Sequence, residues 1–134
     1  MISQYLATAL KEAGLAWNPG GHDRFVIPER DLDGDVFSIN DLSIEVQQLA
    51  GHPAIMFNGT VEWALDWIHT GEVIWLPTEE QLRNALGDRF IALEATGDGF
   101  RCVVRVDASE EHFAAETAVD AYGYALLACL ERPA

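Results

Sequence analysis

Short connections between strand-like runs constrain the fold of this chain more than any other feature. Four such runs follow one another at 24–28, 36–40, 43–49 and 54–58. Neighbouring parallel strands need a crossover of about a dozen residues or more, whereas antiparallel strands can be joined by a tight turn. Turn-forming residues lie between the runs, at 40–41 and 51–53. The sequence therefore predicts antiparallel pairing in this half of the chain.

Helices are predicted before and after these strands. Ser3 can cap a first helix that ends at Gly14, and Thr78 and Gln81 have the spacing of a capping box for a helix that ends at Gly87. The apolar side of the first helix consists of Tyr5, Leu6, Ala9 and Leu10, and that of the later helix consists of Leu82, Ala85 and Leu86. Between them, Thr60 is expected to cap a helix over 61–70, which Val73–Leu76 follows as a buried strand.

The last third of the chain begins with a second hairpin, over 89–95 and 100–106. Ser109 is expected to cap a short turn, and a long helix then runs to Arg132. Its apolar face consists of Val119, Tyr122, Leu126, Cys129 and Leu130. The order of elements predicts one α+β domain over 1–134, with helices packed on a mainly antiparallel sheet in two or three layers.

The charge of the chain excludes several classes of partner. The sequence has 22 acidic and 8 basic residues, which give a net charge of −14, and Lys11 is its only lysine. Nucleic acids and anionic membranes are bound through clustered Lys and Arg, so neither is an expected partner. Residues 1–5 lack the basic and apolar parts of a signal peptide, and no apolar run reaches the ~20 residues of a membrane span. We expect a cytoplasmic protein.

Two groups of acidic residues are candidates for a metal site or an acid–base pair. Glu62, Asp66 and His69 share one stripe of the helix predicted over 61–70, opposite its apolar side. That stripe is also where an amphipathic helix places its wet face. The second group is an acidic loop over 29–35, whose candidate ligands are Asp31, Asp33 and Asp35. Its spacing does not match an EF-hand loop, which favours a solvated turn.

The cysteines and the tryptophans indicate packing and contact rather than catalysis. Cys102 and Cys129 lie in apolar settings without Cys/His ligand spacing, so we expect buried free thiols and no cofactor. Trp63 and Trp67 are one helical turn apart on the flank of the helix predicted over 61–70. A flanking pair is typical of the edge of a core, but tryptophan is also enriched at interface centres. Trp63 and Trp67 are therefore the candidate interaction residues.

Three segments of the chain carry a family resemblance. They are Asp23–Pro28, Phe57–Leu65, and Trp75–Pro77 together with Glu80–Arg83. In these segments the chain resembles a group of small actinobacterial proteins, some of which are labelled pilus assembly proteins. The shared motifs are turns, caps and core positions, so the resemblance implies a fold but no catalytic residue.

The sequence supports two functional hypotheses from different classes. The leading one is a small acidic binding or accessory module that contacts a protein partner or a second copy of itself, as in a homodimer. The alternative is an enzyme or metal-dependent binder that uses the stripe at Glu62, Asp66 and His69, or the acidic loop over 29–35. The enzyme needs polar groups that converge in a concave pocket, whereas the module needs an exposed apolar patch.

Overall fold

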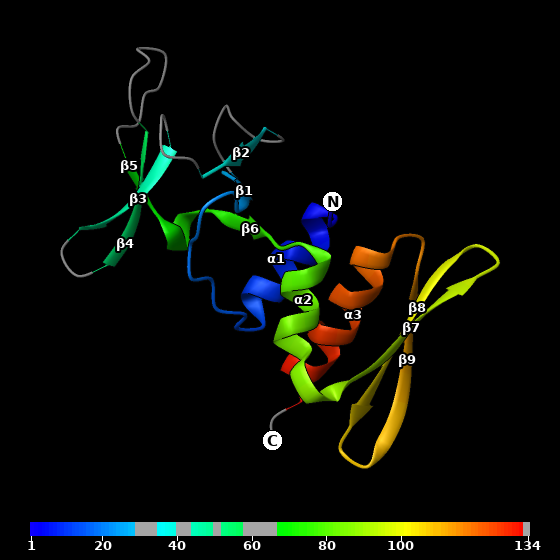
Figure 1. The fold of residues 1–134 in the computed structure, drawn as a ribbon. Helices are drawn as coiled ribbons and strands as arrows, with labels where there is room; N and C mark the ends of the chain where they lie inside the picture. Colours follow the sequence, from blue (N-terminus) through cyan, green and yellow to red (C-terminus); the bar gives the residue numbers. More distant parts are fainter. Residues whose placement is uncertain (29–34, 40–43, 50–51, 58–66, 133–134) are drawn as a thin grey trace. The chain divides into compact units, whose positions relative to one another are not determined.

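The chain is an α+β protein with antiparallel sheets, as the sequence predicts. The computed structural model describes residues 1–28, 35–39, 44–49, 52–57 and 67–132 (Figure 1). The chain divides into two compact units. The first unit consists of residues 1–15 and 77–134, and the second consists of residues 16–76. Strands pair antiparallel in each described sheet. The prediction of a single domain over the whole length stays a prediction.

The second unit consists of two small sheets. One has the order β2-β1-β6 and is built from β1 (Arg24–Val26), β2 (Val36–Ser38) and β6 (Ile74–Leu76). The other has the order β3-β4-β5 and is built from β3 (Ile44–Leu49), β4 (His52–Phe57) and β5 (Trp67–His69), which the short 3-10 helix η1 (Thr70–Glu72) follows. The predicted runs for β1 to β4 and for β6 are thereby confirmed.

Aromatic and branched side chains form the core of this unit. Its buried residues are Phe25, Ile27, Ile39, Ile55 and Val73. The rings of Trp17 and Trp75 stack with their centroids 6.1 Å apart, and Phe25 touches both Trp17 and Phe37. The Trp17 indole N–H donates to Asp23 Oδ2 at 2.9 Å, which ties the loop before β1 to the aromatic cluster.

The prediction of a helix over 61–70 is wrong for the part of that segment that the structure describes. Trp67–His69 form β5, which pairs with β4 so that Ile68 lies opposite Ile55. Aromatic and β-branched residues suit a strand, and the pairing with β4 decides between strand and helix here. Residues 58–66, where the rest of that prediction falls, lie outside the described residues.

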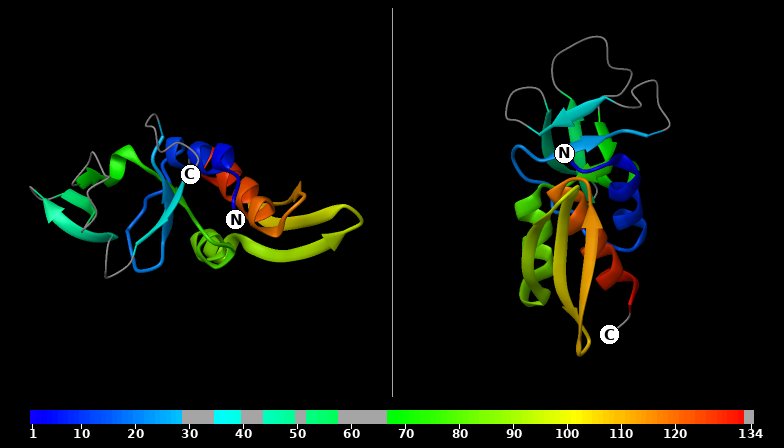
Figure 2. Two further views of the ribbon diagram at one scale, coloured as in Figure 1. Left: turned by 90° about the horizontal axis from the view of Figure 1, so that it is seen from above. Right: turned by 90° about the vertical axis from the view of Figure 1, so that its right-hand side faces the viewer.

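The first unit packs three helices and a hairpin-built sheet. It contains α1 (Gln4–Glu12), α2 (Glu79–Leu86), η2 (Gly87–Arg89), β7 (Phe90–Thr96), β8 (Gly99–Val106), β9 (Ser109–Ala115) and α3 (Ala118–Glu131). The sheet has the order β7-β8-β9. Helix α3 packs on β8 and β9 and also contacts α1 and α2 (Figure 2).

Local signals set the ends of α1 as predicted. The Ser3 side chain accepts a hydrogen bond from the Leu6 N–H, which caps the helix start. At the other end Gly14 has a φ of 100°, and the Leu15 N–H reaches back to the Leu10 carbonyl at 3.0 Å. This is a Schellman ending, which favours glycine because of the positive φ. The buried face consists of Leu6, Ala7 and Leu10, whereas Tyr5 is 81% exposed and Ala9 is only half-buried, which corrects the prediction for these two residues.

The capping box of α2 is present as the sequence predicts. Thr78 Oγ1 accepts from the Gln81 N–H at 3.2 Å, and Gln81 Oε1 accepts from the Thr78 N–H at 2.9 Å. The buried face contains Leu82 and Leu86, whereas Ala85 is exposed, which corrects the prediction for that residue.

The cap at Thr78 gives a stability prediction. We expect Thr78→Ala to lower the free energy of unfolding by about 1 kcal/mol, because the hydroxyl that accepts from the Gln81 N–H is lost, while the Thr78 N–H that donates to Gln81 Oε1 is kept. Thr78→Ser keeps a hydroxyl acceptor and is the matched control. Urea unfolding followed by circular dichroism measures both variants, and an equal loss in both would contradict a role for the hydroxyl group.

The prediction that a helix follows Ser109 is wrong in its first part. Residues Ser109–Ala115 form β9, which pairs along its whole length with β8. Asp107 adopts a φ of 57° in the two-residue turn between these strands. The helix begins only at Ala118, where Thr117 Oγ1 accepts from the Asp120 N–H. Pairing with β8 therefore overrides the helical preference of this segment.

Helix α3 is the most buried helix of the first unit. The predicted face is confirmed at Val119, Tyr122, Leu126 and Cys129, which are buried, while Leu130 is only half-buried. No helix in the described ranges combines the length and the apolar character that crossing a bilayer requires.

Candidate functional site

An open hollow lies along β9 and α3 in the first unit. It has a volume of about 680 Å³ and contains residues from both elements. The residues from the strand side are His112, Phe113, Ala114, Ala115 and Glu116, and those from α3 are Asp120, Tyr124, Leu127, Ala128 and Glu131. Tyr124 is 39% exposed, which is high for a large side chain on a packed helix. The hollow therefore combines an apolar floor with acidic residues.

The strand side of the hollow is the edge of a sheet. Successive side chains of a strand point to opposite faces, so a hollow on one face would be lined by every second residue. Here consecutive residues, 112–116, line it, which means that the hollow runs along the strand edge. The sheet order β7-β8-β9 leaves that edge without a neighbouring strand in the described sheet.

The register of the hairpin shows which main-chain groups face that edge. Val106 and Ser109 close the two-residue turn and form a hydrogen-bonded pair. Bonded and non-bonded pairs alternate from there, so the N–H and C=O groups of Glu110, His112 and Ala114 point away from β8. Among the described residues no main-chain bond to another segment uses these groups. They are donors and acceptors for an additional strand.

The helix side of the hollow is one stripe of α3. Its residues are spaced by four, three, one and three positions, which keeps them on a single face of the helix. The stripe from Asp120 to Glu131 is about 16 Å long at 1.5 Å per residue. The strand segment 112–116 spans about 14 Å. The hollow thus has the length of about five residues of extended chain.

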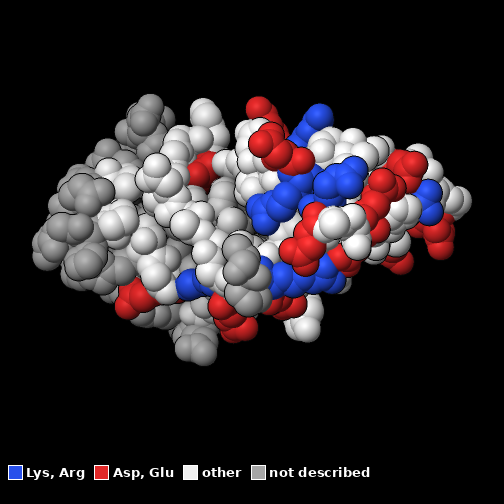
Figure 3. All heavy atoms as spheres, turned by 90° about the horizontal axis from the view of Figure 1, so that it is seen from below, with Lys and Arg blue, Asp and Glu red and all other residues white. Residues whose placement is uncertain are grey.

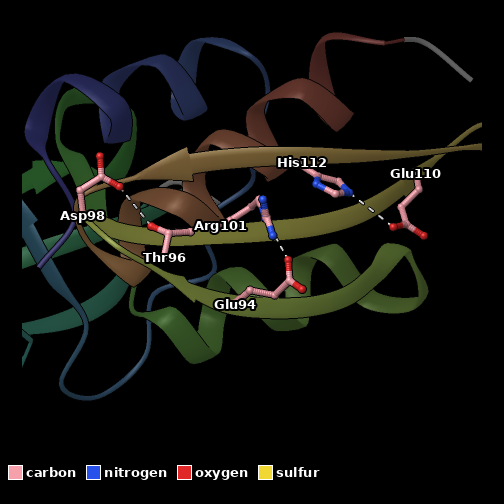
Figure 4. A network of polar contacts seen from close by, with 6 residues as sticks. All are labelled: Glu94, Thr96, Asp98, Arg101, Glu110 and His112. Carbon is pink, nitrogen blue, oxygen red and sulfur yellow. Dashed lines mark hydrogen bonds and ion pairs between the residues drawn. The ribbon is translucent and has the colours of Figure 1, made fainter.

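Polar side chains cover the face of the sheet that carries Glu94 and Arg101. Arg101 Nε donates to Glu94 Oε1 at 2.9 Å across β7 and β8, and His112 Nε2 lies 3.4 Å from Glu110 Oε1 on β9 (Figure 4). All four side chains are between 42% and 52% exposed, so the pairs contribute little to stability. These exposed side chains make this face a solvated surface.

A second hollow of about 330 Å³ has a different charge. Its basic residues are Arg89, Arg105 and Arg132, and it also contains Asp88, Val106, Asp107 and Cys129. Basic side chains are visibly gathered on one face of the molecule, among acidic ones (Figure 3).

Two arginines of the second hollow have structural partners. Arg89 donates to the carbonyls of Leu86 and Ala85 at the end of α2, and Arg132 binds both carboxylate oxygens of Glu111. Hydrogen bonds from Arg132 lower the pKa of Glu111 below its usual value. Arg89 thereby caps the end of α2, and Arg132 ties the end of α3 to β9.

The two cysteines are buried and free, as predicted. Burial, together with the nearby Cys129, raises the pKa of the Cys102 thiol to about 11, and burial also raises the pKa of Cys129. A thiol with so high a pKa is almost fully protonated at neutral pH, and the thiolate is the reactive form. Neither cysteine has the environment of a nucleophile.

The structure does not bring the predicted metal ligands together. Glu62, Asp66, Asp31 and Asp33 lie outside the described residues, while Asp35 is exposed just before β2. His69 is in a strand, so the helical stripe does not extend to it. Within the described ranges, no three His, Cys, Asp or Glu residues are grouped so that they could hold a metal ion.

The predicted interaction residues are described only in part. Trp63 lies outside the described residues, and Trp67 is the first residue of β5, opposite Met56 of β4. Self-association through these two tryptophans stays a prediction.

Comparisons of the chain with protein-family models, curated proteins and solved structures return no match. The function is therefore argued from the hollow itself. Sequence reasoning missed this site because it assigned 109–117 to a turn and the start of a helix. The available signal was the Asp107-Ala108 pair directly after an alternating strand, which is a position for a hairpin turn.

Proposed function

We propose that this chain is a protein-binding module that takes up an extended segment of a partner protein along β9. The observation that carries the proposal is that the free edge of β9 runs along an apolar-floored hollow. A segment added there would bond to the outward main-chain groups of Glu110, His112 and Ala114 while its side chains enter the space beside α3. This is recognition by strand addition, in which the main chain supplies affinity and the pockets supply specificity.

The floor of the hollow supports this binding mode. Ala114, Ala115 and Ala128 are small and leave room for the side chains of an added segment, while Tyr124 and Leu127 offer apolar surface. Native proteins usually protect such an edge with lysine, proline or a bulge. Between Ser109 and Ala115 there is no lysine or proline, and the register with β8 runs without a bulge.

A proline scan of the two sheet edges tests the proposal. Ala114→Pro removes an outward N–H at the β9 edge, whereas Ala95→Pro removes one at the opposite edge, on β7. Both residues are exposed alanines in non-bonded pairs, so neither substitution breaks a bond to β8. The probe is an end-capped, fluorescein-labelled peptide of seven residues in which glutamines at positions 2 and 6 flank a threonine–valine–threonine centre.

We expect fluorescence anisotropy to show binding to the wild-type chain and to Ala95→Pro. Ala114→Pro should weaken binding by about tenfold or more, because one hydrogen bond is left unmade and the strand cannot approach. Equal weakening by the two prolines would contradict strand addition at β9. If neither this peptide nor its lysine counterpart binds the wild-type chain, strand addition at β9 is also contradicted.

The resemblance to small actinobacterial proteins, the pilus-assembly label and the cytoplasmic location stay predictions. They are compatible with a module that binds another protein.

A further inference from the structure

We infer that the segment bound along β9 is cationic, with two basic residues about four positions apart and an apolar residue midway between them. This inference rests on the proposed strand addition at β9. The observation that supports the inference is that acidic residues stand as a rim around the apolar part of the hollow. Glu116 and Asp120 lie near the start of α3 and Glu131 lies at its last turn, with Tyr124 and Leu127 between them.

The acidic rim is not a simple result of the net charge. No Lys or Arg lines this hollow, whereas three arginines line the other hollow of the same unit. Arg132, which binds Glu111 of β9, lies in the other hollow, so the acidic groups of the β9 hollow have no lysine or arginine in its lining. The side chains of Glu116 and Glu131 are exposed and have no hydrogen bond or ion pair among the described residues. Asp120 is already engaged, since its Oδ1 accepts from the Ser3 N–H at 3.0 Å.

The length of the hollow sets the spacing of the basic residues. Asp120 and Glu131 are about 16 Å apart along the helix axis. Side chains of an extended segment alternate between its two faces, so only residues an even number of positions apart share a face, and four positions span about 14 Å. A lysine or arginine at each end of such a segment would reach the two acidic ends of the hollow at once. The residue midway between them would meet the apolar floor.

A second copy of this chain is a poor occupant of the hollow. A copy could add a strand only through one of its edge strands, which in the described sheets are β2, β6, β3, β5, β7 and β9. None of these strands contains Lys or Arg. Their addition would bring together two chains that each carry a net charge of −14, and like charges oppose association. A basic segment of another protein has the complementary charge.

Three matched peptides test the inference. They share the threonine–valine–threonine centre described above and carry lysine, glutamine or glutamate at positions 2 and 6. We expect the lysine peptide to bind the wild-type chain about fivefold or more tightly than the glutamine peptide, because two exposed ion pairs contribute about 0.5 kcal/mol each. The glutamate peptide should bind most weakly. The advantage of lysine should shrink as salt is added.

Two charge variants locate the effect on the rim. The double variant Glu116→Gln/Glu131→Gln should remove the advantage of the lysine peptide and leave the glutamine peptide unaffected. The control Glu79→Gln/Glu80→Gln changes the net charge equally on α2, outside the hollow, and should keep most of that advantage. Equal loss in both variants would mean a long-range charge effect and would overturn the rim as the recognition element.

The outcomes distinguish the inference from the proposed function. Lysine and glutamine peptides that bind equally, with both sensitive to Ala114→Pro, would overturn the cationic partner and leave strand addition standing. If the peptides bind the Ala114→Pro variant as tightly as the wild-type chain, strand addition itself is overturned. Light scattering measures the oligomeric state. If the wild-type chain is a dimer and the Ala114→Pro variant is a monomer, a second copy occupies β9 and the cationic partner is overturned.

Discussion

Replacing Phe25 with alanine is expected to lower the free energy of unfolding by about 3–5 kcal/mol. The Phe25 side chain is 0% exposed, and its ring touches both Trp17 and Phe37. Removing it leaves a cavity that the paired strands on both sides of β1 cannot close without breaking their register. Small proteins are stabilised by only about 5–15 kcal/mol in total, so this variant loses a large share.

Phe37→Ala is the matched control for this prediction. Phe37 lies directly opposite Phe25 on β2 but is only half-buried. Phe37→Ala should therefore lose less transfer free energy and leave a smaller cavity than Phe25→Ala. Urea unfolding of both variants, followed by tryptophan fluorescence, compares them. A Phe25→Ala variant no less stable than Phe37→Ala would contradict the placement of Phe25 at the centre of the core.

Gly99→Ala is the second substitution with a large expected effect. A Cβ atom at Gly99 would lie 2.2 Å from the Ala115 carbonyl oxygen and 2.9 Å from the Glu116 Cα. Both neighbours are main-chain atoms, so no side chain can rotate away and the end of β9 must move. Overpacking of this kind costs about 1–3 kcal/mol of stability. The β8–β9 ladder should loosen at its open end, next to the hollow.

The control for Gly99→Ala lies in the same turn. An added Cβ at Gly97 would have no atom within 4 Å, and its φ is not positive, so Gly97→Ala should be close to neutral. Urea unfolding compares the two variants. Amide chemical shifts of Ala115 and Glu116 should change in Gly99→Ala and stay near their wild-type values in Gly97→Ala. Equal stability of the two variants would contradict the close approach of β8 to β9.

Signals confined to a few neighbouring residues predicted much of this fold. The cap at Ser3, the ending at Gly14, the capping box at Thr78 and the hairpin turn before Gly99 each depend on bonds between residues close in sequence. Such bonds form wherever the local chemistry allows, so the sequence is sufficient to place them. The antiparallel sheets followed for the same reason, because short connections permit little else.

Contacts between distant segments account for the errors. Residues 110–115 include glutamates and alanines that favour a helix, and only pairing with β8 makes them a strand. Trp67–His69 likewise become a strand through pairing with β4. Predicting the candidate site requires both local signals and contacts between distant segments, because the edge of β9 exists only if this segment forms a strand. For this reason the sequence predicts contact residues at Trp63 and Trp67, whereas the site proposed along β9 depends on a strand that the sequence did not predict.

The division into two units has a consequence for biosynthesis. Helix α1 belongs to the unit whose remaining residues begin at Pro77, so the ribosome completes residues 16–76 before the partners of α1 leave the exit tunnel. A nine-residue helix is marginal in water by itself. Helix α1 can therefore pack against α3 only after the whole of the inserted segment, 16–76, has been synthesised.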